Sequence, residues 1–67
     1  SIRLLDDVNG TARKILIASV DGKVVYHGTF MRDEAIKTLN LPGIKPGQYI
    51  VKLFENQLVR RRDFIKL

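Results

Sequence analysis

Residues 15–30 read ILIASVDGKVVYHGTF, and this stretch decides the fold class. Asp21-Gly22 stands between two apolar runs rich in β-branched residues, an arrangement typical of a β-hairpin. A two-residue turn of type I′ needs positive φ at both central positions, which Asp and Gly tolerate. The stretch therefore predicts one strand that ends near Val20 and a second strand from Lys23 to Phe30.

The same stretch predicts how the two strands pair. With Val20 and Lys23 on either side of the turn, alternation along antiparallel strands fixes the register. Apolar residues lie on both faces of this hairpin, and we expect one of them to be the core face. The predicted cross-strand pairs are Ile17 with Tyr26, Ser19 with Val24 and Ala18 with Val25, and the predicted core face carries Ile15, Ile17, Val24 and Tyr26.

A second turn signal, Asn9-Gly10, precedes this hairpin. It predicts that a strand from about Ile2 to Val8 pairs with the strand that follows from Thr11 to Val20. The first three strands would then form a meander.

The second half of the chain also predicts strands. Ala35, Ile36 and Leu39 have a spacing that a helix could use, but Pro42 would stop it after about two turns, so we expect a strand. Gln48 to Phe54 is rich in β-branched and aromatic residues and predicts another. Leu58 to Leu67 predicts the last strand, with a β-bulge near Arg61 because its apolar alternation slips there. Six short strands with regular turns indicate a single all-β domain over residues 1–67, a sandwich or a barrel.

Composition argues against an enzyme. The chain has 67 residues and no cysteine, so neither a disulfide nor a cysteine metal site supports the fold. His27 is the single histidine, and Ser1 and Ser19 are the serines, which do not assemble a nucleophile with its base. The pair Asp6-Asp7 offers too few oxygens for calcium and is expected to accept backbone hydrogen bonds near a turn. We expect no catalytic residue, no metal and no cofactor.

The net charge of +5 is concentrated near the end of the chain. Arg60-Arg61-Arg62 is its most conspicuous feature, and charged residues on an edge strand discourage aggregation without any further function. The alternative is a basic docking patch for an acidic partner or an anionic polymer. That patch would consist of Lys52, Arg60, Arg61 and Arg62. Nucleic acid is the weaker option, because Tyr49, Phe54 and Phe64 follow core-like strand positions.

Four blocks of the chain together resemble one known family: residues 15–17, Asp21-Gly22-Lys23-Val24-Val25, residues 39–52 and Phe64-Ile65-Lys66-Leu67. That family is the type IX secretion system C-terminal sorting domain. The most specific part of the resemblance is the block around Pro46-Gly47-Gln48-Tyr49-Ile50-Val51, which is similar to the family's Leu-x-Pro-Gly-x-Tyr-x-Val pattern. The chain lacks the Pro-Asn-Pro segment that often opens the family's domain, so its first strand is expected to be trimmed or divergent.

The resemblance implies a small Ig-like antiparallel β-sandwich of about six to seven strands that directs a cargo protein through the periplasm and across the outer membrane to the cell surface. It implies three partners, namely an outer-membrane translocon, a shuttle and a sortase, and in many members the cargo is joined to anionic lipopolysaccharide. Ser1 at the first position indicates a fragment of a longer secreted protein. No apolar run is long enough for a membrane-spanning helix. The expected sorting residues are Gly22, Lys23, Pro46, Gly47, Tyr49, Val51, Phe64, Ile65, Lys66 and Leu67.

Two further hypotheses stay open at the level of sequence. One is a structural or adhesive β-sandwich tail, whose information would be spread over exposed loops. The other is a basic β-barrel that binds nucleic acid, which would require steep salt dependence of binding.

Overall fold

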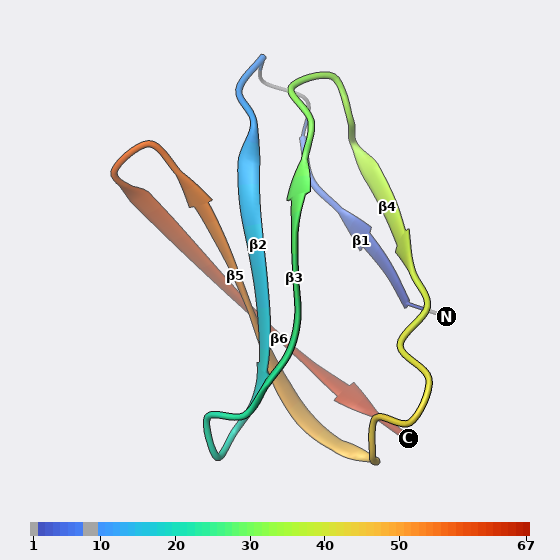
Figure 1. The fold of residues 1–67 in the computed structure, drawn as a ribbon. Helices are drawn as coiled ribbons and strands as arrows, with labels where there is room; N and C mark the ends of the chain where they lie inside the picture. Colours follow the sequence, from blue (N-terminus) through green and yellow to red (C-terminus); the bar gives the residue numbers. More distant parts are fainter. Residues whose placement is uncertain (1, 8–9) are drawn as a thin grey trace.

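The computed structural model describes residues 2–7 and 10–67, which form six β-strands and no helix. All pairings are antiparallel, in one four-stranded sheet of order β3-β2-β5-β6 and one two-stranded sheet of β1 and β4 (Figure 1). The predicted all-β class is confirmed. The strands are β1 (Ile2–Leu5), β2 (Arg13–Ser19), β3 (Val24–Phe30), β4 (Ile36–Leu39), β5 (Gly47–Glu55) and β6 (Leu58–Lys66).

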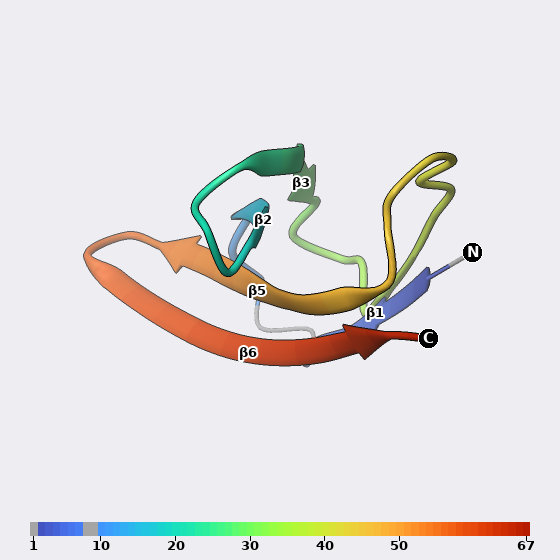
Figure 2. The same ribbon diagram turned by 90° about the horizontal axis from the view of Figure 1, so that it is seen from below.

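The core lies between the two sheets. The four-stranded sheet curls from β6 through β5 and β2 to β3 (Figure 2), and we call the face that lines the core its inner face. Partly buried Ile2 and Leu4 of β1 pack against this core from the smaller sheet. The buried apolar residues are Ile15, Ile17, Phe30, Leu39, Tyr49, Val51 and Leu53.

The hairpin between β2 and β3 forms where Asp21-Gly22 predicts it, but with a different turn. The Gly22 N–H donates to the Ser19 carbonyl at 2.9 Å, and the Ser19 N–H donates to the Lys23 carbonyl at 2.9 Å. Gly22 has φ +92°, whereas Asp21 is not in the positive-φ region. The prediction of a two-residue type I′ turn is therefore wrong. The loop has three residues with glycine in the left-handed position, the next most common hairpin geometry.

The register of this hairpin shifts by one residue at a β-bulge between Ile17 and Ala18. Ile17 pairs with Tyr26 as predicted, but Ala18 pairs with Val24, so the predicted pairs Ser19 with Val24 and Ala18 with Val25 are wrong. The bulge turns Val24 to the outside, where it is 50% exposed. Val25 packs against the core with Tyr26 instead. The rest of the predicted core face, Ile15, Ile17 and Tyr26, is confirmed.

The predicted meander is wrong at its first strand. β1 pairs with β4, with Ile2 opposite Leu39 and Leu5 opposite Ile36, and not with β2. Asn9 of the predicted turn lies outside the described residues. Pairing with β4 lets β1 cover the inner face of the larger sheet, where Ile2 and Leu4 are removed from water.

The strands predicted in the second half of the chain are confirmed as β4, β5 and β6. The predicted bulge near Arg61 is wrong, because β6 pairs with β5 without a register shift from Leu58 opposite Glu55 to Lys66 opposite Gly47. The slip in apolar alternation has another cause. Arginines, not apolar residues, occupy two inward positions of β6, opposite the buried residues Val51 and Leu53.

Candidate docking site

The last strand, β6, forms one edge of the four-stranded sheet, with β5 as its single neighbour among the described strands. Side chains of a strand alternate between its two faces. Arg60, Arg62 and Phe64 stand opposite Leu53, Val51 and Tyr49 and thus share the inner face. The outward positions are exposed and hold Val59, Arg61, Asp63 and Ile65. The strand therefore offers a free row of backbone groups and an exposed row of side chains.

The inner face ties β6 to the start of β5 through an aromatic pair. The rings of Tyr49 and Phe64 stack with centroids 5.3 Å apart and planes at 16°. The Tyr49 hydroxyl donates to the Lys45 carbonyl at 2.5 Å, across the turn at Pro46-Gly47. Gly47 has φ +150°, a conformation that favours glycine. Tyr49 therefore fixes both the turn before β5 and the position of β6.

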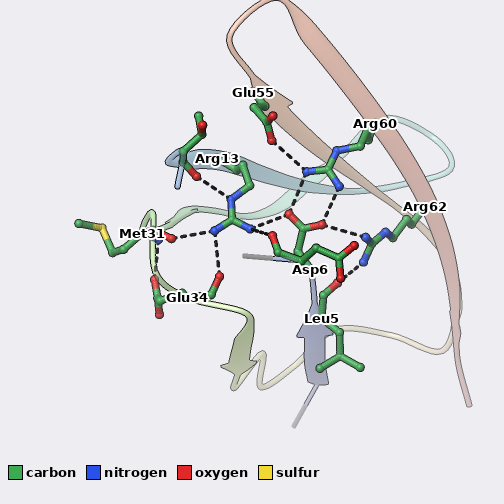
Figure 3. A network of polar contacts seen from close by, with 10 residues as sticks. Leu5, Asp6, Arg13, Met31, Glu34, Glu55, Arg60 and Arg62 are labelled. Atoms are coloured by element: carbon green, nitrogen blue, oxygen red, sulfur yellow. Dashed lines mark hydrogen bonds and ion pairs between the residues drawn. The ribbon is translucent and has the colours of Figure 1, made fainter. Parts of the chain in front are cut away.

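Farther along the inner face, three arginines converge on one buried carboxylate, that of Asp6 (Figure 3). Arg60 donates both terminal nitrogens to it, at 2.6 and 2.8 Å. Arg13 Nη1 and Arg62 Nη2 donate at 2.8 and 3.1 Å. Paired in this way, the Asp6 side chain is only 1% exposed. Asp6 thus joins the segment after β1 to both β2 and β6.

Arg13 is the most deeply buried charge of the cluster, with no exposed side-chain surface. Its five N–H donors are all used, one for Asp6 and four for backbone carbonyls at 2.7 to 2.9 Å. The guanidinium also lies 5.0 Å from the centre of the Phe30 ring, within the range of a cation–π contact. The four carbonyls belong to Thr11, Asp7, Met31 and Glu34.

Neither the burial of Arg13 nor the role of Asp6 was predicted from the sequence. A signal for Arg13 is present, because it precedes Ile15 and Ile17 at the same two-residue spacing and so falls on the core face. Asp6 carried no comparable signal.

The arginines lower the pKa of the Asp6 carboxyl group. Hydrogen bonds from Arg60 hold the pKa of the Asp6 carboxyl far below its ordinary value, aided by Arg13 and against the opposing effect of burial. The same bond raises the pKa of Arg60. Asp6 is therefore ionised at any physiological pH, and the cluster is held by full charges.

The four residues of the predicted basic patch do not lie on one surface. Arg60 and Arg62 are on the inner face and bind Asp6. Lys52 and Arg61 face outward, directly opposite each other on β5 and β6, and both are exposed. The structure thus brings together Lys52 with Arg61, and separately Arg60 with Arg62.

Comparison with known protein families gives one match. Residues 1–66 match the model of the secretion system C-terminal sorting domain. The chain belongs to this family. No curated protein and no solved structure matches this chain. Family membership makes it a secretion signal of the type IX system, a kind of domain that is generally not catalytic, on a protein destined for secretion or the cell surface.

The residues predicted from the sequence as the sorting motif do not form one continuous site. Lys23, Pro46, Gly47 and Tyr49 line one hollow between the β2–β3 turn and the segment before β5. Val51 is in the core, and Gly22 is in the hairpin turn. In the last block, Phe64 packs inward and Lys66 is partly buried. Ile65 and Leu67 are 69% and 97% exposed.

Two other kinds of site, a metal cluster and a membrane-spanning helix, are absent from the described residues. Residues 2–7 and 10–67 contain no cluster of three or more potential metal ligands. In the same ranges no helix is long and apolar enough to cross a membrane. His27 is exposed on β3, in a hollow with Lys14 and Leu16.

Proposed function

We propose that this sorting domain directs a cargo protein joined upstream of it across the outer membrane, and that an outer-membrane translocon, a shuttle and a sortase recognise it through its last strand. The proposal rests on a family match over the whole chain and on the position of the last strand, whose outer edge has no partner among the described strands. An open edge recognises a partner by strand addition, in which main-chain hydrogen bonds give affinity and alternate side chains give specificity.

The arrangement of β6 supports this mode of recognition. The Tyr49–Phe64 stack and the arginine pairs with Asp6 fix its inner side chains. Its outward side chains and its free edge are left for a partner. Ile65 and Leu67 are exposed apolar residues of the kind that a receptor pocket would bury.

The test is export of a periplasmic reporter fused in front of the domain, in a bacterium that has type IX secretion. The fusion should reach the cell surface, and deletion of residues 65–67 should block this step. The deletion keeps Phe64 and its stack on Tyr49, so the sandwich should stay folded, which hydrogen exchange of the β5 amides would check. If the folded, truncated fusion is exported at the normal rate, the address does not lie in residues 65–67 of the last strand. If the unchanged fusion does not reach the surface, an adhesive tail becomes the better description.

A further inference from the structure

The outer face of the four-stranded sheet combines exposed cations with apolar side chains. The register places Leu16, Lys52 and Arg61 in one row across β2, β5 and β6. The next row is Lys14, Phe54 and Val59. Lys14, Lys52, Val59 and Arg61 are exposed, whereas Leu16 and Phe54 are half-buried.

Lys52 and Arg61 form a like-charge pair at the centre of this face. Like charges directly opposite on neighbouring strands destabilise a sheet. Arg61 has an ion pair with Asp63 at 3.2 Å, but no acidic residue within the described chain pairs with Lys52, whose neighbour on β2 is Leu16. The face therefore has an unbalanced positive charge that the fold itself does not need.

Two hollows lie on this face beside the cations. One is lined by apolar residues that include Leu16, Ala18, Val24 and Ile50, and Lys52 is also part of its lining. The other has Lys14, Leu16, His27 and Phe54 in its wall. Apolar hollows with cations next to them fit a protein surface that presents carboxylates around an apolar side chain.

We propose that this outer face docks an acidic surface of a secretion-machinery protein, with Lys14, Lys52 and Arg61 meeting its carboxylates and the hollow beside Leu16 and Ile50 taking an apolar side chain. The proposal rests on the proposed function and adds a second contact surface to the edge of β6. A glycan polyanion would satisfy the cations but has no apolar side chain for the hollow, so we favour a protein partner.

The test uses Lys52→Glu in the reporter fusion. This change replaces the like-charge pair by a cross-strand ion pair with Arg61 and should stabilise the sheet, while it places a carboxylate against an acidic partner. We expect the rate of surface display to fall about tenfold or more, and hydrogen exchange of the β5 and β6 amides to be no faster than in the unchanged fusion. The matched control is Arg3→Glu, an exposed cation of β1 that changes the net charge equally and should leave export unchanged.

Four outcomes would overturn the proposal. Normal export of Lys52→Glu, while deletion of residues 65–67 still blocks export, would refute the outer face but leave the proposed function standing. Equal slowing by Arg3→Glu would assign the effect to net charge. Disappearance of the Lys52→Glu effect in a strain without anionic lipopolysaccharide would assign the face to the glycan. Failure of the unchanged fusion to reach the surface would refute the proposed function and this inference with it.

Discussion

Tyr49 shows how one residue can connect two parts of a sequence motif. The residue is 5% exposed, its ring stacks on Phe64, and its hydroxyl donates to the Lys45 carbonyl. The sequence predicted a core-like strand position for Tyr49, and its burial confirms this. Its partner Phe64 was not predicted, since it comes from a strand whose facing depends on long-range register.

Two substitutions at Tyr49 should separate the contribution of its hydroxyl to stability from that of its ring. Tyr49→Phe keeps the stack and removes only the hydrogen bond to Lys45, so we expect a loss of about 0.5–1.5 kcal/mol in the free energy of unfolding. Tyr49→Ala should cost about 3–5 kcal/mol because it also leaves a cavity. Denaturant titration of the purified protein measures both. Equal losses in the two variants would mean that the ring does not contribute to the core.

Position 28 requires glycine because there is no room for a Cβ, and not because of a positive φ. A Cβ at this position would overlap the ring end and the hydroxyl of Tyr26, which lies across the glycine on the same strand. We expect Gly28→Ala to cost about 1–3 kcal/mol. In a Tyr26→Ala background the same change should cost much less, because the overlapping atoms are gone. A double-mutant cycle measures this coupling, and additive losses would contradict it.

At the scale of strands, local signals predicted elements better than their partners. The strands β3, β4 and β5 follow from turn residues and alternation within a few positions. The pairing of β1 with β4 does not, because it depends on which face of the larger sheet remains uncovered. The inward arginines of β6 were equally hard to predict, since a run of three arginines gives no indication of which members face a buried carboxylate 54 residues away.

Arg60 and Arg61 are neighbours on β6 but face opposite sides of the sheet, so their substitution should have different effects on stability. Arg60→Gln removes a bidentate bond to a buried carboxylate and should cost about 1–2 kcal/mol, a value reduced because the Arg60 side chain is one-third exposed. Arg61→Gln changes an exposed side chain and should stay within about 0.5 kcal/mol of the unchanged protein. Thermal or denaturant unfolding compares the two. A larger loss for Arg61 would mean that the inner and outer faces of β6 are assigned the wrong way round.

At the scale of the whole molecule, the Asp6 cluster joins both sheets. Asp6 follows β1 and its N–H donates to the carbonyl of Ala35, just before β4. Its carboxylate binds β2 through Arg13 and β6 through Arg60 and Arg62. A domain of 67 residues without disulfides has little core to spare, so breaking such a cluster affects the entire fold.

The cluster predicts how stability depends on pH. The pKa of Asp6 is depressed in the folded state, so its contribution is fully present above the ordinary value of 3.8 and is lost as the pH falls below it. Asp6→Asn leaves the buried Arg13 without its counter-ion and should cost about 3–5 kcal/mol at neutral pH. In addition, the free energy of unfolding of Asp6→Asn should fall less steeply below about pH 4 than that of the unchanged protein.

Arg62→Gln is the matched control, because it removes the longest and most exposed of the three pairs and should keep the acid dependence. Urea titrations at several pH values measure both quantities. If the free energy of unfolding of Asp6→Asn fell as steeply with pH as that of the unchanged protein, another carboxyl group would be responsible for the acid sensitivity, and not Asp6.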